Sequence, residues 1–233
     1  MKIALFGYGK MGKTIEKIAQ ERGHEIVLKI DKDSENYDIS VADIAIEFST
    51  PDSAFDNITQ ALSKKIPVVA GTTGWLSRYD QAVRICNENQ TGFLYASNFS
   101  VGVAIFFELN KFLARVMSNL NQYKVSIEEI HHTEKLDAPS GTAITLAEGI
   151  IEQTNKKGWQ LGDKVSEDEI PITALRIGNT PGTHTITYQS EVDTLEIKHM
   201  AHNRLGFALG AVLAAEWLLN KKGVFSMKDV LFN

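Results

Sequence analysis

The sequence predicts an α/β protein in which a doubly wound parallel sheet is followed by an α+β segment with a mixed, largely antiparallel sheet. Short β-branched runs alternate with amphipathic helical patterns through residues 1–100, as expected for βαβ units. Beyond residue 101, one long helical pattern and a series of strand-like runs replace this alternation. The chain has 233 residues and is 43% hydrophobic, which suits one large domain or two small ones.

The expected elements follow from hydrophobic periodicity, which is two residues for strands and about 3.6 for helices. In the first part, strands are expected at 2–6, 25–30, 44–48, 68–70 and 93–96, and helices at 11–22, 54–64 and 77–89. In the second part, helices are expected at 104–117 and 141–153, and strands at 123–131, 172–177, 183–189 and 194–199. A polar stretch lies at 155–169, the last two strands suggest a hairpin, and an apolar helix at 207–219 precedes a short tail.

Composition excludes several classes of protein. The formal net charge is -5, so no basic surface is expected to neutralise a nucleic acid backbone. No segment approaches the roughly 18 uninterrupted apolar residues that a membrane-spanning helix requires, and no secretory signal is recognisable. We therefore expect a soluble, cytoplasmic protein that binds neither nucleic acid nor membranes. The single cysteine, Cys86, cannot form an internal disulfide.

A glycine-rich turn, G-Y-G-K-M-G, follows the first expected strand and opens a helix. Gly7, Gly9 and Gly12 have the G-x-G-x-x-G spacing, which allows a tight turn and close approach of a pyrophosphate to the backbone. Asp31 ends the second strand about twenty residues on, where an acidic residue would bind an adenosine ribose. Lys32 would attract a 2′-phosphate instead, although a solvated loop lysine explains it almost equally well. The pattern predicts a Rossmann-like dinucleotide site.

Two further turns follow strand ends at the same edge of this sheet. E-F-S-T-P begins at Glu47, and G-T-T-G begins at Gly71. Ligands in open α/β sheets bind outside the carboxyl ends of the strands, so both turns are candidates for cofactor contacts. Helix capping explains Ser49 and Thr50 equally well.

The stretch E-I-H-H-T-E-K-L-D-A-P-S-G-T-A, residues 129–143, concentrates groups that suit catalysis. In an extended chain His131 and His132 point to opposite faces, so they are poor partners for one metal ion. The pair His199 and His202 lacks a clear third ligand, and no metal is expected. Ser140, Gly141 and Thr142 open a helix whose amides and hydroxyls could receive an anion, with Lys135 nearby.

The same stretch resembles the signature of the 4-hydroxy-tetrahydrodipicolinate reductase family, the dihydrodipicolinate reductases of lysine and diaminopimelate biosynthesis. The glycine turn and the segments E-F-S-T, A-G-T-T-G, A-S-N-F-S-V-G-V and G-T-H-T-I-T-Y resemble other landmarks of that family, in the same order. The resemblance implies a dinucleotide-binding Rossmann domain formed by residues 1–100 and 205–233. It also implies a substrate-binding and tetramerisation domain at 101–204, a homotetramer, and reduction by NADH or NADPH.

The resemblance also implies roles for individual residues. His131 corresponds to the proposed general acid, and Lys135 to a residue that assists protonation and substrate binding. His132, Ser140, Gly141 and Thr142 would bind the carboxylates of a dicarboxylate substrate. The residues expected to bind the cofactor are Gly7, Gly9, Lys10, Met11, Gly12, Asp31, Lys32, Phe48, Ser49, Gly71, Thr72, Thr73, Ser97, Asn98 and Phe99.

The residues support this chemistry independently, because hydride addition to a conjugated ring imine must be completed by a proton. Histidine titrates near neutral pH and suits that task. Two alternatives remain open from the residues alone. Another Rossmann oxidoreductase, acting on a small carboxylate such as an amino acid, would share the glycine turn but not the His-His-Lys and Ser-Gly-Thr constellation. A nucleotide-binding module or redox sensor would need neither His131 nor Lys135.

Overall fold

The computed structural model describes residues 1–32, 34, 36–163, 165–203 and 205–232. The chain divides into two compact units, one formed by Met1–Val101 with Leu205–Asn233 and the other by Gly102–Arg204. The expected domain boundary at Arg204 itself lies outside the described residues. Within the part of the chain that is described, no helix is both long and apolar enough to cross a membrane.

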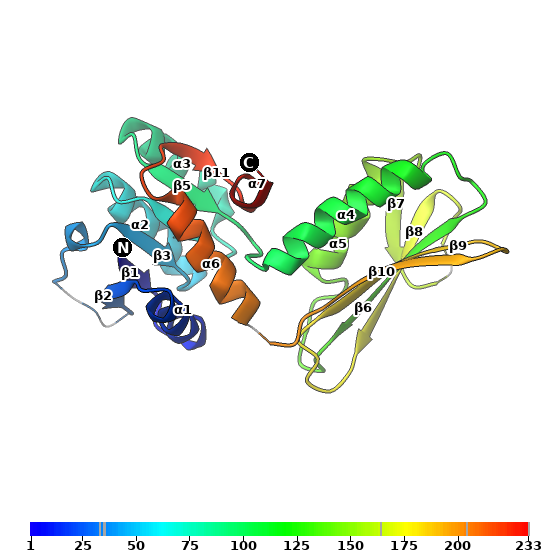
Figure 1. Cartoon of the computed structure of the whole chain (residues 1–233), viewed down its shortest axis with the longest axis horizontal. Helices are drawn as coiled ribbons and strands as arrows, with labels where there is room; N and C mark the ends of the chain where they lie inside the picture. The colour runs from blue at the N-terminus through cyan, green and yellow to red at the C-terminus, as the bar shows by residue number, and fades with distance from the viewer. Residues whose placement is uncertain (33, 35, 164, 204, 233) are drawn as a thin grey trace. The chain divides into compact units, whose positions relative to one another are not determined.

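The first unit contains a six-stranded sheet whose neighbouring strands are all parallel, with helices on both faces (Figure 1). In spatial order its strands are β11 (Gly223–Phe225), β5 (Gly92–Tyr95), β4 (Val68–Ala70), β3 (Ile44–Glu47), β1 (Lys2–Phe6) and β2 (Glu25–Ile30). Its helices are α1 (Lys10–Glu21), α2 (Pro51–Ser63), α3 (Tyr79–Glu88), α6 (Leu205–Leu218) and α7 (Met227–Phe232), with short 3-10 turns at Ile39–Val41 and Leu76–Arg78. The predicted doubly wound sheet is confirmed.

Alternation along β1 explains why helices cover both faces of this sheet. Ile3 and Leu5 are buried in a cluster with residues of α1 and α6. Ala4 and Phe6 are buried in a second cluster, with residues of α2 and α3. A central parallel strand is thus apolar on both sides. Both chain ends contribute to this unit, since α6, β11 and α7 join the elements of the first hundred residues (Figure 1).

The second unit contains a five-stranded sheet with one helical layer on it, and the predicted mixed pairing is confirmed. In spatial order its strands are β10 (Thr194–Met200), β9 (Thr183–Gln189), β6 (Lys124–His131), β8 (Glu169–Arg176) and β7 (Gly158–Leu161). The β10–β9 and β9–β6 pairs are antiparallel, and the β6–β8 and β8–β7 pairs are parallel. Parallel pairing is therefore more extensive than predicted, because the crossover through α5 (Gly141–Ile151) returns the chain in the direction of β6.

Helices α4 (Val101–Met117) and α5 lie side by side on one face of the second sheet (Figure 1). Asn110 on α4 is buried, and its Nδ2 donates a hydrogen bond of 2.8 Å to the carbonyl of Leu146. A Cβ atom at Gly149 would lie 3.2 Å from that Nδ2 atom, so glycine permits the close approach of the two helices. At the surface, Lys111 and Glu152 form an ion pair of 2.7 Å between the helices.

Two short strands and one short helix were not predicted. β7, which reads G-W-Q-L, lies in the polar stretch at 155–169 and leaves its side chains partly or fully exposed, so it shows no apolar alternation. β11 has three residues and α7 has six, both in what the sequence presents as a tail. β8 begins at Glu169, earlier than expected, because Ile170 is fully buried on the inner face.

The packing of α6 in the first unit yields a testable prediction. A Cβ atom at Gly210 would lie 1.7 Å from the carbonyl oxygen of Phe99, which is a backbone atom and cannot rotate away. Gly210→Ala should therefore destabilise the protein by at least about 1–3 kcal/mol, the usual cost of overpacking. This cost outweighs the gain of about 1 kcal/mol that alanine brings to a helix interior.

Gly206 on the same helix is the matched control, because a Cβ atom there would have Ser100 Oγ as its nearest neighbour, at 3.8 Å. Gly206→Ala should leave the free energy of unfolding unchanged or raise it. Urea denaturation of both variants and the natural protein provides the comparison. Equal stability of the two alanine variants would show that α6 does not approach the 99–100 segment as described.

Candidate active site

The three glycines of the first turn have different structural reasons. A Cβ atom at Gly7, where φ is +88°, would lie 2.1 Å from the carbonyl oxygen of Phe48. A Cβ atom at Gly12 would lie 2.3 Å from the carbonyl oxygen of Gly7. At Gly9, by contrast, nothing lies within 4 Å of the Cβ position. Packing within the protein therefore explains Gly7 and Gly12, whereas Gly9 leaves open space in front of the backbone.

Helix α1 begins immediately after this open space. Gly9 is its N-cap and provides no side-chain hydrogen bond to the first turn. Lys10 is exposed and Met11 is half-buried in that turn. Unpaired amides at a helix N-terminus, together with the positive end of the helix dipole, form a receptor for an anionic group.

A buried carboxyl group joins the two neighbouring turns. Glu47, fully buried at the end of β3, accepts hydrogen bonds through Oε1 from the Ser49 amide (2.9 Å), the Ser49 hydroxyl and the Thr72 hydroxyl (2.9 Å). Burial raises the pKa of Glu47 although these hydrogen bonds oppose the change. The ring of Phe48 occupies the space that a Cβ atom at Gly71 would need. The E-F-S-T and G-T-T-G turns are thus held together beside the glycine turn.

The other residues expected to bind the cofactor lie in less enclosed positions. Thr73 and Ser97 are exposed, and Asn98 accepts a hydrogen bond from the amide of Ser100 at 2.8 Å. The side chain of Phe99 is buried in the core of the first unit, with its ring centroid 5.4 Å from that of Phe48. Only the backbone around Phe99, and not its ring, is therefore suited to contact a ligand.

Asp31 and Lys32 follow β2, as predicted, and both are exposed. Asp31 Oδ1 accepts a hydrogen bond of 3.0 Å from the Lys32 amide, and the Asp31 amide donates to Ser34 Oγ at 3.0 Å. These bonds order the backbone of the turn. They leave the second carboxylate oxygen of Asp31 and the ammonium group of Lys32 facing solvent.

In the second unit, strand register gathers charged residues on the inner face of the sheet. Glu129 and His131 are two residues apart on β6 and share the buried face with Val125 and Ile127. Glu129 pairs with His184 on β9, and His131 pairs with Arg176 on β8. Buried charged groups on a strand face are costly unless they are paired, so this arrangement demands an explanation.

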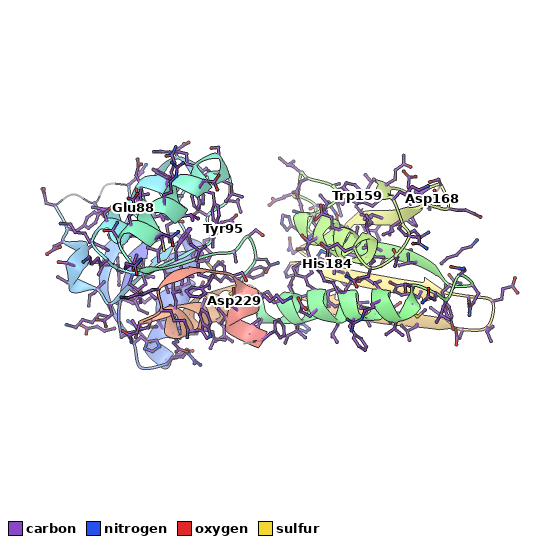
Figure 2. The ribbon with its side chains drawn as sticks, turned by 90° about the horizontal axis from the view of Figure 1, so that it is seen from above. Glu88, Tyr95, Trp159, Asp168, His184 and Asp229 are labelled. Atoms are coloured by element: carbon purple, nitrogen blue, oxygen red, sulfur yellow. The ribbon has the colours of Figure 1, made fainter. Side chains whose placement is uncertain are left out.

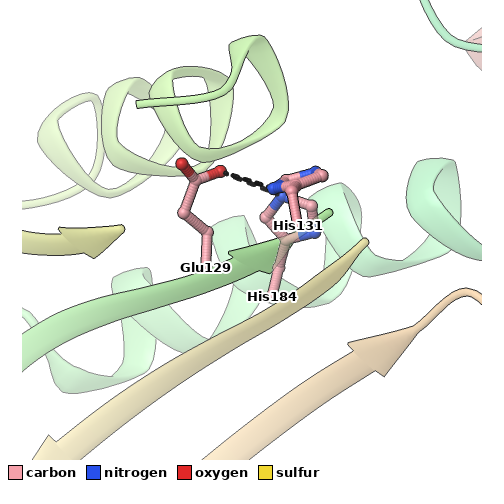
Figure 3. Close-up of side chains that lie close together, drawn as sticks. All are labelled: Glu129, His131 and His184. Carbon is pink, nitrogen blue, oxygen red and sulfur yellow. Dashed lines mark ion pairs between the residues drawn. The ribbon is translucent and has the colours of Figure 1, made fainter. Parts of the chain in front are cut away.

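Glu129 is fully buried, and its carboxylate points towards the ring of His131 (Figure 3). Its Oε1 atom accepts hydrogen bonds from the Ser140 amide at 3.0 Å and from Arg176 Nη2 at 3.1 Å. Its Oε2 atom lies 3.2 Å from Nδ1 of His131, an ion-pair distance, although neither atom has a hydrogen bond of good geometry. Burial alone would raise the pKa of Glu129, but the contacts of His131, Ser140 and Arg176 outweigh it and lower that pKa to about 2.

His184 is also buried in the second unit (Figure 2), and together with Glu129, His131 and Ser140 it forms what we call the buried group. Its Nε2 atom lies 3.1 Å from Ser140 Oγ, which also caps α5 by accepting a hydrogen bond from the Ala143 amide. Its ring lies edge-on to that of His131, with centroids 5.1 Å apart. Burial, followed by the charge of His131, lowers the pKa of His184 to about 4, so His184 is neutral at neutral pH.

Lys135 belongs to the loop between β6 and α5, and its ammonium group binds a neighbour. Lys135 Nζ lies 2.7 and 2.8 Å from the two carboxylate oxygens of Asp137, and this contact lowers the pKa of Asp137. Arg176 contacts the same loop, because its guanidinium group donates hydrogen bonds to the backbone carbonyls of Asp137 (2.6 Å) and Lys135 (3.3 Å). The loop is thus tied to the buried group through Arg176.

Sequence reasoning found some members of this site and missed others. The structure brings His131 and Ser140 together through Glu129, and it leaves open space within 4 Å of the Cβ position of Gly141. Among the described residues, the side chains of the half-buried His132 and Thr142 form no hydrogen bond or ion pair with Glu129, His131, Ser140 or His184. Glu129, Asp137, Arg176 and His184 were given no role. Two of these residues could have been found from the sequence. Glu129 occupies a position of β6 where the alternation of the strand predicts an apolar residue, and His184 lies two residues before Ile186 on the buried face of β9.

The histidine pairs considered for a metal were not the relevant ones. Among the described residues, the structure groups Glu129, His131 and His184, whose potential ligand atoms all lie within 4.8 Å of one another. His199 is the cross-strand partner of His184 on β10, its ring centroid lies 6.0 Å from that of Phe106, and burial lowers its pKa. Chemically, the second unit combines a histidine that can transfer a proton with a capped helix start and a lysine that can bind anions.

Comparison with known proteins agrees with both halves of this description. Residues 1–99 match the family model "Dihydrodipicolinate reductase, N-terminus", and residues 102–231 match "Dihydrodipicolinate reductase, C-terminus". A 4-hydroxy-tetrahydrodipicolinate reductase of Christiangramia forsetii is 59% identical over 234 aligned positions, covering 99% of this chain and 98% of the relative. One of Thermosipho africanus is 34% identical, with the same coverage of both chains.

A solved structure shares the fold. The dipicolinate-bound dihydrodipicolinate reductase from Paenisporosarcina sp. TG-14 superposes with a TM-score of 0.76 at 24% sequence identity, covering 97% of each chain. The two matched halves, the extent of sequence identity and the shared architecture lead to one conclusion: the chain belongs to the dihydrodipicolinate reductase family.

Proposed function

We propose that this chain catalyses the NAD(P)H-dependent reduction of 4-hydroxy-tetrahydrodipicolinate, by way of dihydrodipicolinate, to tetrahydrodipicolinate. The observation that carries the proposal is the combination, in one family member, of a buried histidine and a capped helix start that both contact a single buried carboxylate. Other Rossmann oxidoreductases need the glycine turn but not this arrangement. Since the reaction consumes NAD(P)H, we infer that the protein works in the cytoplasm.

The first unit is assigned to the cofactor. The open space at Gly9 suits the approach of a pyrophosphate to the backbone, and the amides of Lys10, Met11 and Gly12 at the start of α1 would bind its oxygens. The remaining contacts are assigned to the three turns at the carboxyl edge of the sheet: Phe48 and Ser49, Gly71 to Thr73, and Ser97 to Phe99 by its backbone.

The second unit is assigned to the substrate and the proton. A bound nicotinamide would supply hydride to the conjugated ring, and His131 would donate the proton that completes the reduction. His132, Ser140, Gly141 and Thr142 are assigned to the substrate carboxylates, with Lys135 as the full positive charge. Lys135 would exchange Asp137 for a substrate carboxylate, since the side chain of Asp137 is 61% exposed and can move away into solvent.

Activity can be measured by following NAD(P)H oxidation with substrate made in situ by the preceding synthase reaction. His131→Gln should lower kcat by about 10²–10⁴ while leaving NADH affinity unchanged, because the lost group acts on the proton and not on the cofactor. His202→Gln, which changes an exposed histidine of the same unit, is the control and should retain full activity. Absence of reductase activity in the natural protein would refute the function, and full kcat in His131→Gln would remove His131 from the mechanism.

The protein is proposed to use both NADH and NADPH. The free carboxylate oxygen of Asp31 suits hydrogen bonds from an adenosine ribose, but it would repel a 2′-phosphate by about 1 kcal/mol at 4 Å in water. The exposed ammonium group of Lys32 can offset that repulsion, since its side chain is long and flexible.

We expect kcat/KM for NADH to equal or modestly exceed that for NADPH. Lys32→Ala should raise KM for NADPH selectively, whereas Asp31→Ala should weaken NADH binding. The effect of Lys32 should fade at high salt, because screening reduces the attraction between exposed charges. Steady-state kinetics with both cofactors at two salt concentrations measures all of these. A strong NADPH preference that survives Lys32→Ala would assign the 2′-phosphate to another residue.

A homotetramer is proposed from two unpaired surfaces of the second unit. β10 lies at the edge of the sheet with mostly exposed residues, and an open strand edge is usually protected. On α4, Ile105, Leu109, Phe112 and Val116 are 44–57% exposed and share one face of the helix. A stripe of this kind suits contact with another copy of the chain.

Light scattering at micromolar concentration should give a mass near four times 25.8 kDa. Phe112→Asp should shift the mass towards smaller species, because it introduces a charge into the apolar stripe. Val41→Asp, at a comparably exposed position of the first unit, should not change the mass. A monomeric natural protein, or tetramers in both variants, would contradict the assignment of this interface.

A further inference from the structure

The contribution of Glu129 to stability does not by itself explain why a carboxylate is buried at this position. Glu129 is fully buried, and its only fully charged hydrogen-bond partner among the described residues is Arg176. A buried ion pair is often no more stabilising than well-packed apolar residues, because desolvation offsets the attraction between the charges. The pair therefore suggests a role in positioning other groups.

The two oxygens of Glu129 contact two different parts of the proposed site. Oε1 binds the Ser140 amide, which lies at the start of α5, and the guanidinium group of Arg176. Oε2 faces Nδ1 of His131 at 3.2 Å. One rigid carboxylate therefore sets the distance between the imidazole and the helix start. Arg176 extends this bracing to the carbonyls of Lys135 and Asp137.

The orientation of His131 follows from the same contact. A carboxylate next to Nδ1 favours the proton on that nitrogen, which leaves Nε2 as the atom that exchanges a proton with a substrate. Nε2 faces Gly182, where a Cβ atom would lie only 3.1 Å away, so glycine leaves space at this nitrogen. His184 is neutral at neutral pH, with a pKa of about 4, so it places no positive charge beside His131.

A metal ion is the other explanation for a glutamate grouped with two histidines. The contacts of Glu129 oppose it. Arg176 already balances the single negative charge, and a divalent cation bound by Oε2 would lie near a guanidinium group only 3.1 Å from Oε1. His184 Nε2, a second potential ligand atom, lies at hydrogen-bond distance from Ser140 Oγ. The trio fits proton positioning better than metal binding.

We propose that Glu129, paired with Arg176, is a positioning residue that holds His131 with its proton on Nδ1 and aligns it with the carboxylate-binding start of α5. The expected effect of Glu129 on catalysis rests on the proposed function, whereas its expected effect on the position of the His131 proton does not. Among the described residues, the charged and titratable groups around His131 are Glu129 on β6, Arg176 on β8, His184 on β9 and Lys135 in the loop, and His199 on β10 lies beside His184.

Glu129→Gln tests the proposal, because glutamine retains an oxygen for the Ser140 amide but removes the negative charge. We expect kcat to fall at least tenfold with KM for NADH unchanged. Glu128→Gln changes the exposed neighbour on the opposite strand face and should leave both kcat and KM unchanged. An unchanged kcat in Glu129→Gln would overturn the proposal.

Nitrogen NMR of the imidazole side chains separates this inference from the proposed function. In the natural protein at neutral pH, His131 should carry its proton on Nδ1, and Glu129→Gln should reduce that tautomer. This result would support the positioning role even if no reductase activity were found. A neutral His131 protonated only on Nε2 in the natural protein would overturn it, and that measurement requires no variant to fold.

Discussion

The second unit is organised around one electrostatic constraint, the charge of Glu129 at a position without solvent. A buried carboxylate is tolerated only with compensating partners, and each partner comes from a different element. Arg176 requires β8 to lie parallel to β6 in the observed register, and Ser140 requires α5 to begin above that strand. The crossover and the loop from His132 to Ser140 therefore supply the partners that this charge requires.

Local pattern was sufficient to predict the fold. Apolar runs on β1, β3 and β4 identified a parallel sheet covered on both faces, and a strand, turn and helix around Gly7 to Gly12 identified the nucleotide-binding type. Pattern failed where elements are short or exposed. The side chains of β7 bury little surface, so hydrophobic periodicity carries no signal there. Likewise, parallel pairing of β6 with β8 depends on a crossover that no local window contains.

The site was predictable only in part, for a related reason. His131, Lys135 and Ser140 lie within one continuous stretch and carry groups that suggest chemistry by themselves. Glu129, Arg176 and His184 acquire their meaning from strand register, which brings together residues 47 and 55 positions apart. Glu129 nevertheless had a local signal, because a charged residue on the apolar period of V-S-I-E-E-I-H already indicated a buried group with a partner elsewhere.

The three glycines of the turn G-Y-G-K-M-G are required for two different reasons. Gly7 and Gly12 are constrained by the protein's own backbone, so a side chain at either position would be eliminated by failure to fold. Gly9 meets no protein atom, so a side chain there would be tolerated by the fold and opposed only by whatever approaches from outside. A chain that lost its ligand could therefore drift at Gly9 while retaining the other two, and the middle position alone would record whether the nucleotide is still used.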